Sequence, residues 1–322
     1  MYEMETIGLI GGASGYDMTV ELQRRNRSVA LVAGKNSDPG LDLANHTLVS
    51  DLSDGLAIAD FFKSKGVEKV IVATGHQLAY SLAEYLENQG MVSNINLVGS
   101  NIAKDKVEFK KALDEINIDT PRYVTVRQDE TAPVEKIVRE VKLPCVIKSF
   151  NDKAPAQLVF TEQELDAGIA EMQQAGSAVL LEEYIKGVEC TAAVRCTFTT
   201  QTGLAVGVNY VKARDCKLKG FRDFHQRELT AKESSDILKI CEKISAHLHL
   251  LSLPRFDLIV SEDGRICVLE CNSVTVCSNT NPIYESYIKL YLEPNNIQVA
   301  SIMSDISLDV LTQKMVNKAG LY

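Results

Sequence analysis

The chain has 322 residues, of which 45% are hydrophobic and 24% are charged, as is typical of a globular protein with two or three domains. Its formal net charge of −9 at pH 7 argues against a nucleic-acid partner, because that class of protein needs a basic surface. No apolar run approaches the ~18 residues of a membrane-spanning helix, so a membrane partner is not expected either.

Strand and helix patterns alternate over the first hundred residues. The N-terminal stretch is acidic and leads straight into a strand, so it is not expected to be a signal peptide. Strands are predicted at 6–11, 28–34, 46–51, 68–75 and 95–100. Amphipathic helices are predicted at 17–27, 55–66 and 78–90. Strands separated by helices favour a parallel, doubly wound sheet.

A glycine-rich turn at residues 11–15 follows the first of these strands. Its spacing is not GxGxxG, and no acid follows about 20 residues later at a strand end. A nicotinamide-dependent oxidoreductase built on this sheet is therefore only a weakly supported alternative.

The rest of the chain changes character. A charged helix is predicted over 101–118, and Pro121 ends the linker that follows it. Predicted strands then cover 122–126, 144–150, 156–160, 177–185, 187–200 and 204–211. Predicted helices cover 132–141, 161–176 and 231–251, with one or two more in the C-terminal tail.

The segment 255–272, RFDLIVSEDGRICVLECN, has the pattern of a hairpin. Asp263-Gly264 between two alternating runs predicts a two-residue turn. This turn predicts four cross-strand pairs: Glu262 with Arg265, Ile259 with Val268, Asp257 with Glu270, and Arg255 with Asn272. Because side chains alternate between faces, the last two pairs share one face and Leu269 lies on the other.

Two carboxylates, Asp257 and Glu270, are thus expected to face each other across this hairpin. Like charges in that position destabilise a sheet. A divalent cation would reverse the sign, since two carboxylates and the amide oxygen of Asn272 are the hard oxygen ligands that Mg²⁺ prefers. The alternative is a solvated strand end at which Arg255 and nearby lysines screen the acids.

Three further features carry chemistry. Lys148 lies near the end of an apolar strand, where an ammonium needs an anionic partner. The segment LLEEYIKGVE runs from an apolar strand into Glu182, Glu183 and Glu189. Lys106 lies on the predicted linker helix. Each feature alone is also compatible with ordinary solvent-exposed charge.

In this order the four features resemble the ATP-grasp superfamily of carboxylate-amine ligases, such as biotin carboxylase, carbamoyl-phosphate synthetase and D-alanine–D-alanine ligase. The resemblance implies an α/β chain with an N-terminal parallel α/β pre-grasp domain followed by a two-lobed α+β ATP-grasp fold. It places the pre-grasp domain at 1–105, the small lobe with its linker helix at 106–187, and the large lobe with the metal site at 188–322.

The resemblance also implies a role for each candidate residue. Lys106 and Lys148 would contact ATP phosphates, and Lys148 and Arg255 would act in catalysis. Glu182 (or Glu183) would meet the purine amino group, beside the backbone of Tyr184 and Ile185, and Glu189 would bind the ribose. Leu269 would form an apolar wall beneath the adenine. Asp257, Glu270 and Asn272 would hold two Mg²⁺ ions, with Mn²⁺ as a substitute.

The implied activity is ATP-dependent activation of a carboxylate as an acyl phosphate, followed by its capture by an amine. Amino acids or other small acids are the expected substrates, and a homodimer is the expected assembly. The stretch 149–157 has no glycine where many members have a glycine-rich flap. A non-catalytic Mg-ATP-binding regulatory protein is therefore the alternative. The basic loop 212–227 fits a lid or a solvated loop equally well.

The cysteines indicate the compartment. The chain has 8, with no CxxC pair and no Cys/His metal spacing. In a chain of this length they are typical of reduced thiols, so a cytoplasmic location is expected.

Overall fold

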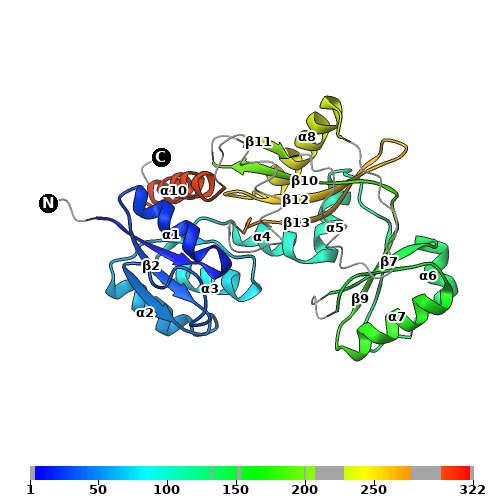
Figure 1. Cartoon of the computed structure of the whole chain (residues 1–322), viewed down its shortest axis with the longest axis horizontal. Helices are drawn as coiled ribbons and strands as arrows, with labels where there is room; N and C mark the ends of the chain where they lie inside the picture. The colour runs from blue at the N-terminus through cyan, green and yellow to red at the C-terminus, as the bar shows by residue number, and fades with distance from the viewer. Residues whose placement is uncertain are drawn as a thin grey trace.

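The computed structural model describes residues 4–131, 133–150, 154–198, 201–206, 228–276 and 299–319. Over these residues the chain forms one five-stranded and two four-stranded sheets, each with its own helices (Figure 1). We call the three groups the N-terminal unit, the small lobe and the large lobe.

The N-terminal unit is the predicted parallel sheet, in the order β3-β2-β1-β4-β5. Its strands are β1 (Thr6–Ile10), β2 (Ser28–Ala33), β3 (His46–Val49), β4 (Lys69–Val72) and β5 (Val92–Ser93). Its helices are η1 (Gly12–Ser14), α1 (Gly15–Arg24), α2 (Gly55–Ser64) and α3 (Gln77–Asn88). The central strands are buried on both faces because helices cover the sheet, as the continuous apolar runs predict.

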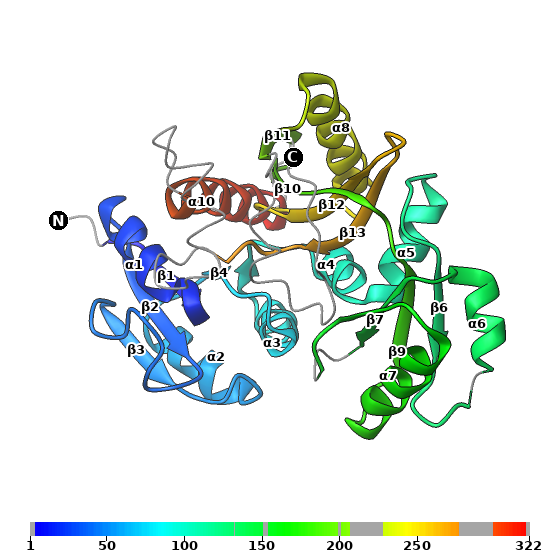
Figure 2. The same cartoon turned by 45° about the vertical axis from the view of Figure 1, so that its right-hand side comes forward.

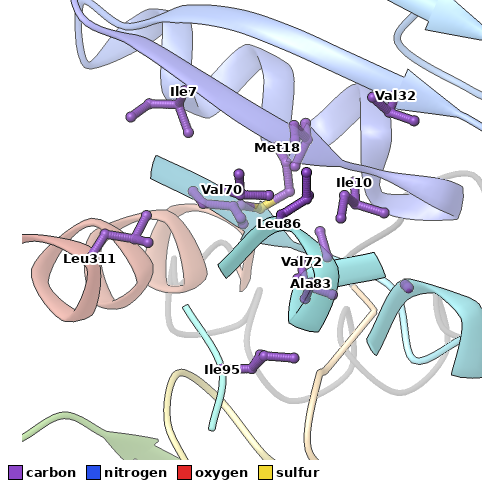
Figure 3. Close-up of a cluster of buried hydrophobic side chains, with 14 of the residues drawn as sticks. Ile7, Ile10, Met18, Val32, Val70, Val72, Ala83, Leu86, Ile95 and Leu311 are labelled. Atoms are coloured by element: carbon purple, nitrogen blue, oxygen red, sulfur yellow. The ribbon is translucent and has the colours of Figure 1, made fainter. Parts of the chain in front are cut away.

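The C-terminal helix α10 (Val299–Lys318) completes the core of this unit. Figure 3 shows Leu311 of α10 beside the core that contains Ile7, Val70 and Leu86. Helix α10 also presents Ser307, whose hydroxyl accepts a 3.0 Å bond from the Asn94 amide. The last helix of the predicted third domain therefore packs in the core of the first.

The strand predicted at 95–100 is wrong. Helix α4 (Leu97–Lys104) begins there, with the Asn96 side chain accepting a bond from the Gly99 amide at 2.8 Å. The cap outweighs the β-propensity of the apolar residues. The predicted helix 101–118 is also divided: Asp105 caps a second helix, α5 (Lys106–Glu115), through the amides of Val107 and Glu108.

The small lobe is an antiparallel sheet in the order β6-β9-β7-β8. Its strands are β6 (Tyr123–Val126), β7 (Cys145–Ser149), β8 (Gln157–Val159) and β9 (Val179–Glu183), and its helices are α6 (Val134–Val141) and α7 (Glu162–Gln174). The predicted capping box at Thr161 and Glu164 is confirmed. One face, with Ile147 and Leu181, packs on the helices. Lys148 and Glu182 alternate onto the other face.

The large lobe is an antiparallel sheet in the order β11-β10-β12-β13. Its strands are β10 (Gly187–Cys196), β11 (Gln201–Val206), β12 (Arg255–Ser261) and β13 (Ile266–Asn272), and its long helix is α8 (Ala231–His247). Phe256 and Leu258 share its core with Ile244 of α8 and with Phe109 and Leu113 of α5. Helix α5 thus packs mainly with the large lobe.

In both views the small lobe (green) and the N-terminal unit (blue) stand on opposite sides of α4 and α5, with the large-lobe strands above (Figures 1 and 2). None of the helices in the described part of the chain is long and apolar enough to cross a membrane. The domain boundaries at 105 and 187 stay predictions.

Candidate active site

The hairpin of β12 and β13 places the two predicted carboxylates opposite each other. Asp257 pairs with Glu270 and Arg255 with Asn272, as predicted. Nearer the turn the predicted pairs are wrong, since Leu258 rather than Ile259 faces Val268. The turn is a three-residue loop at Glu262-Asp263-Gly264, with Gly264 at φ +87°, so Ser261 rather than Glu262 lies opposite Arg265.

A β-bulge at Leu269 accounts for both results. The register shifts between Asp257 and Leu258, so one extra residue of β13 is accommodated there. Leu269 consequently lies on the same face as Glu270 and packs against Ile185, Ile259 and Cys267. The expectation that Leu269 lies opposite the acids is therefore wrong, and the bulge sets an apolar side chain beside the carboxylates.

The two acids differ in their surroundings. Asp257 is 3% exposed, accepts a 2.5 Å bond from the Thr191 hydroxyl on β10, and lies 3.2 Å from the Arg255 guanidinium. Glu270 is exposed, with the Asn272 amide 3.5 Å away. The Arg255 guanidinium offsets the charge of Asp257, whereas the Glu270 carboxylate faces solvent.

The N-terminal unit reaches this end of the hairpin. The Tyr80 hydroxyl of α3 lies 2.8 Å from that of Ser273, the residue after Asn272. Burial raises the pKa of the Tyr80 phenol to about 12, so it stays protonated as a hydrogen-bonding group. The exit of β13 is thus fixed between two units of the fold.

A buried cluster of charges lies on the small-lobe face. The Glu182 carboxylate of β9 binds Lys148 of β7 through Oε2 and Lys110 of α5 through Oε1, the latter at 2.6 Å. Lys148 lies opposite Leu180, so Glu182 is its diagonal neighbour on the same face. Tyr123 lies directly opposite Glu182, with its ring centroid 5.2 Å from the Lys110 nitrogen.

The charges of this cluster support one another. Burial alone would raise the pKa of Glu182, but the two lysines lower it to about 2. Burial opposes the charge of Lys148 too, yet Glu182, with Glu270 and Glu189 of the large lobe, raises its pKa. Lys148 therefore lies within electrostatic range of carboxylates from both lobes. In Lys110, burial lowers the pKa and outweighs the opposing effect of Glu182.

The remaining predicted residues lie around this region. Lys106 donates from its ammonium to the Phe150 carbonyl, just beyond Lys148, at 3.3 Å. Glu183 binds Arg122 at 2.7 Å and Arg265 at 3.1 Å, so it ties the linker to the hairpin turn.

The connection from β9 to the large lobe places three more predicted residues. The Tyr184 amide donates to the Pro144 carbonyl at 3.4 Å. Ile185 packs beside Leu269, and Glu189 lies opposite Ile259. These three residues therefore lie along the segment that connects the small lobe to the large lobe.

Two contributors were missed from the sequence. Lys110 lies four residues after Lys106, on the same side of α5 as buried Leu113, and a lysine at an apolar helix position was the available signal. Thr191 depends on the register of β10 against β12, which no local pattern indicates. The basic loop 212–227 and residues 151–153 of the stretch 149–157 lie outside the described residues.

The chemical types of these side chains suit a magnesium-bound nucleotide. Two acids and an amide at the hairpin provide oxygen ligands, and Lys106 and Lys148 provide cations for phosphate. Leu269 with Ile185 offers an apolar contact for a base. Within the described ranges, no three His, Cys, Asp or Glu side chains gather as a metal site, so the amide of Asn272 would have to complete the set.

D-alanine–D-alanine ligases are among the known proteins that this chain resembles. A sequence model described as D-ala D-ala ligase C-terminus matches residues 112–282, just over half of the chain. A D-alanine–D-alanine ligase of Carboxydothermus hydrogenoformans is 36% identical over 104 residues, or 30% of this chain and 33% of that protein. One of Pelotomaculum thermopropionicum is 25% identical over 270 residues, covering 77% and 83% of the two chains.

The fold is shared with solved ligases. The D-alanine–D-alanine ligase of Bacillus anthracis complexed with ATP superposes with a TM-score of 0.69, covering 98% of this chain and 99% of that chain at 17% identity. The predicted ATP-grasp architecture is thereby confirmed. At this identity the likeness concerns the fold alone, and the first relative is matched over a third of its length.

Proposed function

The chain belongs to the D-ala D-ala ligase C-terminus family, and we propose on that premise that it is an ATP-dependent carboxylate-amine ligase. It activates a carboxylate as an acyl phosphate, joins it to an amine, and releases ADP and phosphate. One observation carries the proposal: Asp257 and Glu270 face each other on the large lobe, and the charge of Glu270 reaches Lys148 on the small lobe.

The hairpin is the proposed metal site. Asp257, Glu270 and Asn272 would hold two Mg²⁺ ions, for which Mn²⁺ is the proposed substitute. When bound, the metal neutralises phosphate charge and favours in-line displacement. The chain itself orients the Asp257 carboxylate through Arg255 and Thr191.

The nucleotide is proposed to bind between the lobes. Lys106 and Lys148 contact its phosphates as point charges. The base stacks on Leu269, beside the backbone of Tyr184 and Ile185, with Glu182 accepting from its amino group. We favour Glu182 over Glu183, because Glu183 already binds two arginines away from Lys148. Glu189 takes the ribose.

The chemistry proceeds in two displacements. A carboxylate oxygen attacks the γ-phosphorus of ATP, the bond to the bridging oxygen breaks, and ADP leaves with the electron pair. The amine nitrogen then attacks the acyl carbon, phosphate leaves, and the nitrogen proton passes to phosphate or water. Arg255 stabilises the oxyanion that forms at the acyl carbon.

The proposal extends to assembly and compartment. We propose a homodimer that acts on small carboxylates and amines in the cytoplasm. All six cysteines among the described residues are unpaired and buried, which supports a reducing compartment. The alternative of a non-catalytic nucleotide-binding protein is disfavoured, because relatives that match the chain are named as enzymes, among them D-alanine–D-alanine ligases.

An ADP-release screen over pairs of amino acids and other small carboxylates tests the proposal. At least one pair should release ADP and phosphate in equal amounts, and Glu270→Gln should abolish that release while far-ultraviolet circular dichroism stays unchanged. Lys111→Met, at an exposed residue of α5, is the matched control that should keep full activity. Full activity of Glu270→Gln would remove the metal assignment.

A further inference from the structure

Lys110 is an almost completely buried ammonium, 1% exposed, and the proposed reaction gives it no role. Its nitrogen lies 2.6 Å from Glu182 Oε1, 2.7 Å from Thr120 Oγ1 and 3.4 Å from the Pro121 carbonyl. The contact with Oε1 is an ion pair, and the hydrogen bonds of this ammonium go to Thr120 and Pro121. The geometry of this group is therefore fixed.

The partners of Lys110 are themselves held in place. The Thr120 hydroxyl accepts from Lys110 and donates to the Val268 carbonyl of β13 at 2.9 Å. The Val268 amide in turn donates to the Asp119 carbonyl at 2.8 Å. Lys110 thus connects α5, the linker and the bulged strand of the large lobe to the Glu182 carboxylate of the small lobe.

Lys148, the other cation on Glu182, is held differently. Its side chain is 22% exposed, and it forms an ion pair with Oε2 of the carboxylate. The charges of Glu270 and Glu189 also act on Lys148, on the side where phosphate is proposed to bind. A flexible four-carbon stem lets such an ammonium move between neighbouring anions at small cost.

We propose that Lys110 is a positioning residue which fixes Glu182 as the acceptor for the nucleobase, and that nucleotide binding draws Lys148 from Glu182 to phosphate. The inference rests on the proposed function and deepens it. Oε1 stays with Lys110 throughout, and departure of Lys148 frees Oε2 to accept from the amino group of adenine. Recognition of the base and of the phosphates is thereby coupled through one carboxylate.

The two lysines then have separable effects on binding. Loss of Lys110 lets the carboxylate rotate toward Lys148, so the preference for a base with an amino group falls. Loss of Lys148 removes a phosphate contact and leaves the carboxylate in place, so affinity falls equally for all nucleoside triphosphates. A purely structural role for Lys110 would lower both affinities together.

The test measures the dissociation constants of Mg-ATP and Mg-ITP by calorimetry, because ITP carries an oxo group where ATP carries the amino group. Wild type should prefer ATP by about tenfold or more, the size expected of a charge-assisted hydrogen bond. Lys110→Met should bring the ratio close to one. Lys148→Met should weaken both nucleotides about tenfold and keep the ratio.

Controls separate this inference from the proposed function. Lys111→Met, the exposed neighbour on α5, should leave both constants unchanged. Lys110→Arg keeps the charge and is used if Lys110→Met does not fold. It should retain a clear preference for ATP over ITP, and this preference should exceed that of Glu182→Gln. The inference, but not the proposed function, is overturned if the ratio of the Mg-ATP and Mg-ITP dissociation constants is unchanged in Lys110→Met. The same holds if this ratio is equal in Lys110→Arg and Glu182→Gln. Failure of wild type to bind either nucleotide overturns the proposed function as well.

Discussion

Replacing Glu182 by glutamine should destabilise the fold by an amount that follows from the buried cluster. The pKa of this carboxyl lies at about 2 in the fold, against an ordinary value of 4.5, because Lys148 and Lys110 overcome the cost of burial. Each pKa unit corresponds to about 1.4 kcal/mol. The ionised carboxylate therefore stabilises the fold by about 3 kcal/mol at pH 7, which agrees with the ~3–5 kcal/mol lost when a buried ion pair is broken.

The same pKa difference fixes the pH dependence. Because the folded-state pKa is depressed, the stabilisation is complete above pH 4.5 and is lost as the pH falls toward 2. The difference between wild type and Glu182→Gln should therefore shrink by about 1.4 kcal/mol between pH 7 and about pH 3.5.

Urea unfolding followed by far-ultraviolet circular dichroism measures this difference, since the chain has no tryptophan to report by fluorescence. Glu108→Gln, which removes an exposed partner of Lys111, is the control and should change stability by less than ~0.5 kcal/mol. A difference below ~1 kcal/mol at pH 7, or one that stays constant with pH, would refute the reasoning about the cluster.

Three smaller predictions concern individual side chains and the hydrogen bonds that they form. Thr191→Val removes the donor to Asp257 and should cost ~1.5–3 kcal/mol in urea unfolding, whereas an unchanged midpoint would mean that the bond contributes nothing. Asp105→Ala removes the cap of α5 and should cost ~1 kcal/mol, measured in the same way; a stability within ~0.3 kcal/mol of wild type would contradict it. Tyr80→Phe removes the bond to Ser273 and should lower stability by ~1 kcal/mol in thermal unfolding, and a more stable variant would contradict that bond.

The hairpin shows which structural features a local sequence pattern can predict. The Asp-Gly signal located the turn and the alternation located the acids, but the loop is one residue longer than predicted. The bulge at Leu269 restores the register beyond it, so Asp257 and Glu270 still face each other. No local signal in the sequence indicates that bulge, and it is the bulge that turns Leu269 toward the acids.

The errors elsewhere have a common physical cause. Residues 95–100 have strand-like composition, yet the cap at Asn96 and tertiary packing make them the start of a helix. The cluster around Glu182 joins three segments that lie far apart in the sequence. Its geometry depends on the pairing of β7 with β9 and on the docking of α5, and neither is encoded within one segment. Periodicity identifies elements, whereas such contacts depend on the assembled fold.

Binding of Mn²⁺ in the presence of ATP, followed by the electron paramagnetic resonance signal of the free ion, tests the central claim most directly. Wild type should take up Mn²⁺ when ATP is present. Asp257→Asn and Glu270→Gln should each weaken that uptake at least about tenfold while the fold survives, because each removes a charged ligand. Uptake that is equally tight in both variants would contradict the claim that the opposed carboxylates of this hairpin hold the metal of a nucleotide.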